Sequence, residues 1–150
     1  MNMEKQIQYL LDRRQIEDTI ILYATLVDSK QFDRLKEEVF TEDSFIDYRA
    51  TGGASGNIDQ TIEFLKKSMA IFKSQHMMSN IACEISEDGK TAKTRNMLHN
   101  PMTFEWEGKT QTFFCGLWYA DDWVKTDKGW RIKNCIQELS YTFNSPFHKS

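Results

Sequence analysis

The chain has 150 residues, of which 40% are hydrophobic and 27% are charged, and these proportions are typical of one globular domain with a single core. The net charge of −3 argues against a non-specific nucleic-acid binder, because such proteins normally carry a basic excess. No apolar run approaches the ~20 residues that span a bilayer, and the first residues are too charged for a signal peptide. We therefore expect a single domain over residues 1–150, with neither a nucleic acid nor a membrane as partner.

The cysteines and histidines form no recognisable metal or redox motif. Cys83, Cys115 and Cys135 are odd in number and include no CxxC pair, which favours a reduced, cytoplasmic protein in which they are small core residues. The three histidines show neither HxxxH nor HExxH spacing. The sequence therefore predicts no metal ion and no other cofactor.

The first part of the chain is predicted to be helical. Between residues 4 and 27, apolar side chains recur at offsets of three, four and seven, which predicts one buried stripe on a long helix. The stripe consists of Ile7, Leu10, Leu11, Ile16, Ile20, Tyr23 and Val27, with Ile21 and Ala24 beside it. Asp28 lies three residues before Gln31, and this capping-box spacing predicts that its carboxylate caps a second helix. That helix would bury Phe32, Leu35, Val39 and Phe40.

A short strand, a glycine loop and a third helix are predicted next. Residues 44–48 are a strand candidate. The glycines of residues 51–56 lack the spacing of a phosphate-binding loop, so we expect an ordinary connection there. A third apolar stripe predicts another helix and consists of Ile58, Ile62, Leu65, Met69 and Phe72.

From residue 76 onward the sequence predicts strands. Four runs rich in Ile, Thr, Phe, Trp and Tyr cover residues 76–86, 91–104, 109–124 and 129–143. Short, turn-like segments separate them, which makes them antiparallel neighbours. Helices segregated to one face of such a sheet form the α+β arrangement. A strongly bent sheet wrapped over helices would leave a conical cavity for a small molecule.

Four side chains near this expected cavity have both a structural and a chemical interpretation. Asp28 is either a helix cap or a carboxylate at the mouth of the cavity. His76, at the start of the first long strand, is either a hydrogen-bonded structural histidine or a catalyst. His99 shares a strand face with Arg95 and would point into the cavity if that face is concave. Tyr48 could serve the core or the pocket, and the residues alone leave these alternatives open.

Three stretches of the chain resemble the SnoaL-like, nuclear transport factor 2-like superfamily, and in particular its scytalone dehydratase and bile-acid dehydratase members. The stretches are residues 27–35 at a helix end, 45–49 in the short strand and 75–77 at a strand start. The order of elements matches over residues 5–143. The resemblance implies an α+β, cystatin-like fold, which is a cone-shaped barrel of a curved antiparallel sheet packed on three N-terminal helices. It also implies a homodimer or homotrimer packed through the outer sheet face.

The resemblance further implies site residues. Asp28 and His76 occupy the positions of the catalytic aspartate and histidine. The implied substrate-binding residues are Tyr23, Tyr48 and His99, and Trp118 is a further candidate for substrate binding.

The activity that the resemblance implies is a cofactor-independent dehydratase, which is a carbon–oxygen lyase, acting on a hydrophobic, cyclic hydroxy-ketone in an enclosed pocket. His76 would move the proton and Asp28 would fix its tautomer, while tyrosine hydroxyls would donate to the carbonyl oxygen. His99 would assist or bind the leaving group. The alternatives are an isomerase or polyketide cyclase on the same scaffold, or a non-catalytic small-molecule-binding module.

Overall fold

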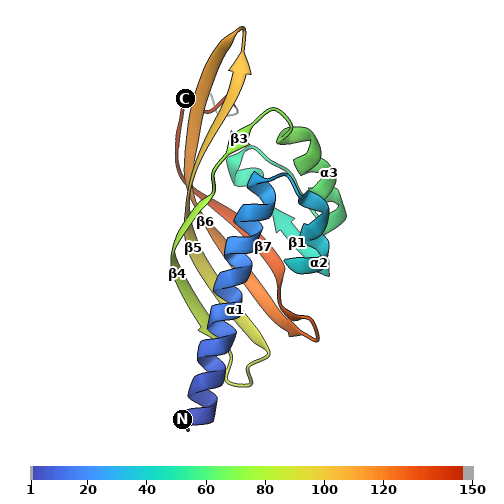
Figure 1. The fold of residues 1–150 in the computed structure, drawn as a ribbon, viewed down its shortest axis with the longest axis vertical. Coiled ribbons are helices and arrows are strands. Elements are labelled where there is room, and N and C mark those ends of the chain that lie inside the picture. The colour runs from blue at the N-terminus through green and yellow to red at the C-terminus, as the bar shows by residue number, and fades with distance from the viewer. Residues whose placement is uncertain (1, 147–150) are drawn as a thin grey trace.

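The computed structural model describes residues 2–146, which form helices packed against one long, twisted sheet (Figure 1). The helical elements are α1 (Met3–Asp28), the 3-10 turn η1 (Phe32–Arg34), α2 (Leu35–Glu38), the 3-10 turn η2 (Arg49–Thr51) and α3 (Ile58–Ser68). The strands are β1 (Phe40–Asp47), β2 (Ser55–Gly56), β3 (Lys73–Ser74), β4 (Met77–Ile85), β5 (Thr91–Trp106), β6 (Lys109–Thr126) and β7 (Gly129–Phe143).

The predicted α+β class and the antiparallel meander of β4 to β7 are confirmed. The sheet order is β2-β1-β7-β6-β5-β3, with β4 also paired to β5. Two details of the predicted barrel are wrong. β1 pairs in parallel with β7, because the chain enters β1 from α2 and runs beside β7 in the same direction. The sheet also stays open, since β2 and β3 at the ends of the order are two residues long and cannot pair across the gap.

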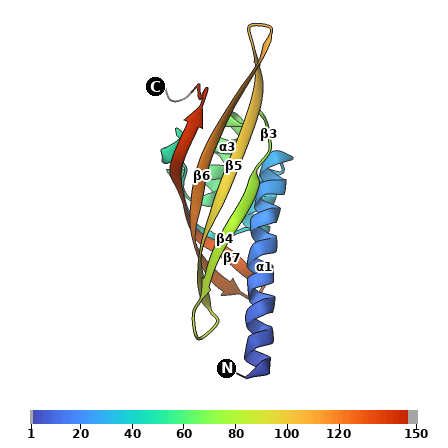
Figure 2. The same cartoon turned by 90° about the vertical axis from the view of Figure 1, so that its left-hand side faces the viewer.

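The core lies between the helices and the concave face of the sheet. Figure 2 shows β4 to β7 crossing one face of the molecule while α1 runs along their edge and α3 lies behind them. α1 packs against β4 and β7, and α3 packs against β1. The largest side chains sealed in this layer include Trp123, Trp130, Phe40 and Phe113. Burial of such aromatic surface is the main favourable contribution to folding.

The N-terminal turns of α1 contradict the predicted buried stripe. Ile7, Leu10 and Leu11 are 51%, 63% and 59% exposed, because this end of the helix projects past the sheet (Figures 1 and 2). Burial begins at Asp12, whose carboxylate accepts a hydrogen bond of 2.9 Å from the Trp130 indole. Within residues 2–146, no helix combines the length and the apolarity needed to cross a membrane.

The other element boundaries follow the sequence closely, apart from β1 and the helices that precede and follow it. β1 begins at Phe40, four residues before the predicted start at residue 44. The four long strands lie within two residues of their predicted ends. The predicted second helix is reduced to η1 and the short α2, because Phe40 already belongs to β1. α3 begins at an Asn57 capping box and ends at Ser68, so Phe72 is buried from the turn that follows the helix.

Candidate active site

A cavity of about 170 Å³ lies between α1, α3 and the concave face of the sheet. Its walls are mostly apolar, and the polar side chains that reach it are Tyr23, Tyr48, Thr51, Ser68, His76, Asn100, Tyr119 and Gln137. Among the described residues that line it, none is Lys, Arg, Asp or Glu. The cavity is therefore suited to an uncharged, largely apolar small molecule.

Asp28 and His76 form a hydrogen-bonded pair at this cavity. Asp28 is the last residue of α1, and His76 lies between β3 and β4. His76 Nδ1 is 2.6 Å from Asp28 Oδ1, and the His76 backbone N–H donates to Oδ2 at 2.8 Å. The Ser74 hydroxyl donates to Oδ1 at 2.7 Å. These three donors turn the carboxylate away from the next helical turn, so the predicted helix cap is wrong and the pairing implied by the resemblance is observed.

The surroundings of Asp28 keep its carboxylate ionised. Burial opposes ionisation, but the hydrogen bonds from His76 and Ser74 together outweigh burial and hold the pKa of Asp28 below its ordinary value. An ionised Asp28 accepts the Nδ1–H of His76, which leaves the lone pair on Nε2. The His76 side chain is 5% exposed and borders the cavity, whereas Asp28 does not line it. His76 thus lies between Asp28 and the cavity, with Nδ1 toward the carboxylate.

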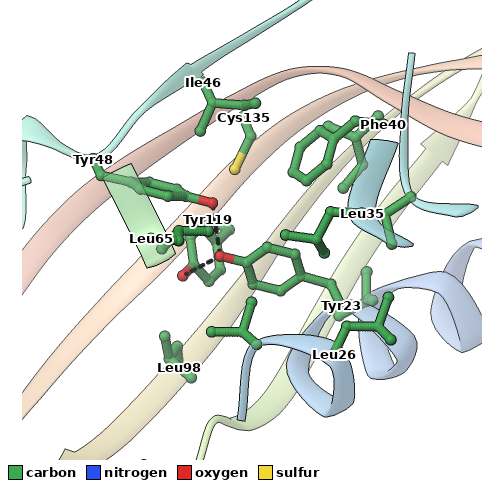
Figure 3. Packing of buried hydrophobic residues seen from close by; sticks show 14 of the residues in the cluster. Tyr23, Leu26, Leu35, Phe40, Ile46, Tyr48, Leu65, Leu98, Tyr119 and Cys135 are labelled. Atoms are coloured by element: carbon green, nitrogen blue, oxygen red, sulfur yellow. Dashed lines mark hydrogen bonds between the residues drawn. The ribbon is translucent and has the colours of Figure 1, made fainter. Parts of the chain in front are cut away.

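Three tyrosine hydroxyls meet at the same cavity. The Tyr23 hydroxyl, from α1, lies 2.7 Å from that of Tyr48 and 3.3 Å from that of Tyr119 (Figure 3). The Gln137 side-chain amide donates to the Tyr119 hydroxyl at 3.1 Å. Burial raises the pKa of all three tyrosines well above the ordinary value, so the hydroxyls keep their protons. The Tyr23 ring stands edge-on to the His76 ring, with centroids 6.3 Å apart, so donors and base border one space.

The glycine loop at residues 51–56 is a connection between elements, and it positions Tyr48. Gly52 has φ +84°, which an L side chain rarely adopts, and it ends η2. Gly53 packs so closely that an added Cβ would lie 2.7 Å from the Tyr48 Cβ. Both glycines also line the cavity. The loop therefore belongs to the candidate site through packing.

His99 and Trp118 do not reach the cavity, and their predicted position is wrong. Both lie on the outer face of the sheet, where His99 Nδ1 is 2.9 Å from the Tyr141 hydroxyl. The Trp118 ring lies under the Arg95 guanidinium, 4.3 Å from it. Alternation along a strand fixes which residues share a face, but a shift of one residue exchanges the two faces.

The residues next in sequence take the inward positions. Asn100 on β5 and Tyr119 on β6 line the cavity, and sequence analysis missed both, together with Gln137 on β7. The only sequence signal for these residues was strand alternation, the same pattern that pointed to His99. Within residues 2–146, no group of three or more His, Cys, Asp and Glu side chains is placed to hold a metal ion.

A buried carboxyl group lies behind the tyrosine cluster. Asp121 on β6 is 5% exposed and lines a second cavity of about 10 Å³, together with Asn96 and Cys135. Burial raises the pKa of Asp121 to about 7, although hydrogen bonds with Cys135 and Thr94 oppose the increase. Asp121 therefore carries a proton over much of the acidic pH range.

Asp121→Asn is expected to stabilise the fold above neutral pH. The folded protein binds the Asp121 proton more tightly than the unfolded chain, in which the pKa of an aspartate is about 3.9. The free energy of unfolding therefore falls as the pH rises from about 4 to about 7, and above that pH the contribution of Asp121 no longer changes. Removing this ionisation should raise the free energy of unfolding at pH 8 by about 1–3 kcal/mol. Urea denaturation across pH 4–8 measures the effect, with Asp122→Asn, at a half-exposed neighbour, as the control. Parallel pH profiles for Asp121→Asn and the unmodified protein would contradict the prediction.

The sequence of the chain matches a known protein family. Residues 8–136 match the SnoaL-like domain family. The uncharacterized protein Rv2910c of Mycobacterium tuberculosis (strain ATCC 25618 / H37Rv) is 40% identical over 134 residues, which cover 85% of this chain and 88% of that protein. The uncharacterized protein Mb2934c of Mycobacterium bovis (strain ATCC BAA-935 / AF2122/97) matches to the same extent.

Solved structures share the fold at lower sequence identity. The Kfla4162 protein of Kribbella flavida has a TM-score of 0.82 at 21% identity, covering 91% of this chain and 95% of that chain. A proposed scytalone dehydratase of Novosphingobium aromaticivorans DSM 12444 has a TM-score of 0.81 at 20% identity, covering 93% and 91%. A type 2 hexachlorocyclohexane dehydrochlorinase (LinA) has a TM-score of 0.80 at 15% identity, covering 97% of both chains.

Proposed function

The chain belongs to the SnoaL-like domain family, and from this premise we propose that it is a cofactor-independent dehydratase that removes water from a hydrophobic, cyclic hydroxy-ketone. The observation that carries the proposal is the Asp28–His76 pair, whose imidazole ring borders the same apolar cavity as three tyrosine hydroxyls. Structural neighbours named as a dehydratase and a dehydrochlorinase support an elimination on this scaffold. The wider family supports a small-molecule-processing enzyme.

The reaction assigns one role to each group. His76 Nε2 takes the proton from the carbon beside the carbonyl, and the C–H electron pair becomes an enolate. Asp28 holds Nδ1–H and stabilises the imidazolium that forms, while the tyrosine hydroxyls donate to the carbonyl oxygen as its charge develops. The enolate then forms the C=C bond as the C–O bond breaks. The leaving hydroxyl takes the proton from His76, which releases water and restores the neutral base.

The cavity limits the size of the substrate. A cavity of roughly 150 Å³ is known to hold one benzene molecule, so about 170 Å³ accommodates a single six-membered ring with a few substituents. A one-ring hydroxy-ketone such as 3-hydroxycyclohexanone is therefore a suitable probe. Its dehydration gives the conjugated cyclohexenone, which differs clearly from the starting ketone by NMR.

The test is incubation of the full chain with 3-hydroxycyclohexanone in D₂O, followed by NMR. We expect deuterium at the carbon beside the carbonyl and formation of cyclohexenone, both faster than without protein. Deuterium exchange without loss of water would favour an isomerase or cyclase and contradict the dehydratase. Binding without exchange or elimination would instead indicate the non-catalytic binding module.

Tyr48→Phe is expected to lower turnover of 3-hydroxycyclohexanone by about tenfold to a thousandfold. The variant removes one donor from a cluster in which Tyr23 and Tyr119 keep theirs, so part of the stabilisation of the enolate oxygen is retained. Initial rates of cyclohexenone formation measure the loss. Tyr141→Phe, on the outer face of the sheet, is the matched control and should keep the original rate. Equal rates for the two variants would remove Tyr48 from the proposed mechanism.

The proposal includes a homodimer or homotrimer formed through the outer sheet face. Apolar side chains are exposed along β7 on or beside that face, and Ile136, Leu139, Tyr141 and Phe143 are 39–53% exposed. Exposed apolar side chains that gather on one strand are characteristic of protein interfaces.

A further inference from the structure

The amide of Asn100 is buried in the wall of the cavity and is only half satisfied. Asn100 lies on β5, is 7% exposed and lines the cavity. Its Nδ2 lies 3.4 Å from His76 Nε2. Its Oδ1 is buried and has no hydrogen-bond partner among the described residues. Buried polar atoms in folded proteins almost always have a partner, so this oxygen needs a hydrogen-bond donor in the cavity, which a hydroxyl group of a ligand can supply.

The Asp28–His76 pair fixes which way the amide faces. Because the ionised Asp28 accepts Nδ1–H, His76 presents a lone pair at Nε2. Only the donor end of the Asn100 amide can face a lone pair, which directs Nδ2 to His76 and Oδ1 elsewhere. An acceptor oxygen is therefore held beside the base, in a cavity whose described lining carries no Lys, Arg, Asp or Glu.

We infer that Asn100 accepts a hydrogen bond from a hydroxyl group of an uncharged ring substrate and thereby selects hydroxyl over halide as the leaving group. The inference rests on the proposed elimination and specifies its substrate. A C–O–H group donates to Oδ1, whereas a C–Cl group offers only lone pairs and faces a like partial charge there. The Asn100 and His76 side chains are adjacent, so a hydroxyl held by the amide lies where the imidazolium can return the proton.

Binding of two matched probes tests this selection separately from catalysis. Cyclohexanol and chlorocyclohexane have one ring each and differ in the group that would meet Asn100. Neither carries a carbonyl group to acidify the adjacent C–H bond, so neither is turned over by the proposed reaction. Dissociation constants are measured by isothermal titration with the full chain and with Asn100→Leu, whose side chain has the same branching and number of heavy atoms but no polar atom.

We expect Asn100→Leu to weaken cyclohexanol binding by about tenfold, the loss of one buried hydrogen bond, and to leave chlorocyclohexane binding unchanged or tighter. Met102→Leu is the control, because Met102 lines the same cavity from the same strand and meets both probes with apolar atoms. An equal change for the two probes in Asn100→Leu would overturn the inference, and so would failure of the unmodified protein to bind cyclohexanol.

A second measurement does not depend on the folding of a variant. In crystals of the unmodified protein soaked with cyclohexanol, the hydroxyl oxygen is expected within about 3.0 Å of Asn100 Oδ1. An oxygen that contacts only the tyrosine hydroxyls would overturn the inference. If hydroxyl selectivity is found but 3-hydroxycyclohexanone is not dehydrated, the proposed function fails while the binding role of Asn100 stands.

Discussion

Asp28→Asn is expected to lower turnover of 3-hydroxycyclohexanone by about 10⁴-fold while the protein remains folded. Asparagine has the shape of aspartate but lacks its charge, so it neither stabilises the His76 imidazolium nor imposes the tautomer with the proton on Nδ1. Its amide oxygen can still accept the His76 backbone N–H and its shape still fills the site. We therefore expect the free energy of unfolding to change by no more than about 1 kcal/mol.

The measurements are initial rates of cyclohexenone formation and urea denaturation of the same preparation. Asp18→Asn is the matched control, because Asp18 lies on the same helix but pairs with Arg14 at the surface. Its turnover should equal that of the unmodified protein. An Asp28→Asn protein that unfolds, or that retains full turnover, would show that the carboxylate is structural and that the pair does not catalyse.

The fold was predictable where local chemistry marks the boundaries. The segment at residues 87–90 and the glycines at 108 and 129 separate the long strands, and the strands begin and end within three residues of these marks. The end of α1 at Asp28 was likewise marked by its break in periodicity. Boundaries that depend on distant parts of the chain were not predictable. Leu10 and Leu11 match a buried stripe in spacing, yet nothing in their own segment shows that the sheet ends before it reaches them.

The candidate site was predictable only in part, for a related reason. The resemblance supplied Asp28 and His76, and the structure brings them within hydrogen-bonding distance. Strand alternation pointed to His99, yet its neighbour Asn100 is the residue that faces the cavity. A period of two fixes which side chains share a face, while packing against the helices decides which face is buried.

The tyrosine cluster shows the same limit across separate elements. Tyr23 and Tyr48 could be proposed because each matched a position in related dehydratases. Tyr119 lies on the sheet 71 residues after Tyr48, and its hydroxyl joins theirs only because the sheet curves over α1. Contacts of this kind are set by tertiary packing, which local patterns do not encode.

His76→Ala is expected to remove both α-deuterium exchange and dehydration, with a loss in turnover of about 10⁴-fold or more, because no other described side chain at the cavity is paired with a carboxylate as a base. The double variant Asp28→Asn, His76→Ala should be no slower than His76→Ala alone, since Asp28 acts through His76 and groups that work as a unit are not additive. Added imidazole should partly restore exchange in His76→Ala, which a purely structural histidine would not allow.

His99→Ala, on the outer face, is the control and should keep the original rates. Exchange that persists undiminished in His76→Ala, or a further large loss in the double variant, would mean that the two residues act independently and that the base is another group.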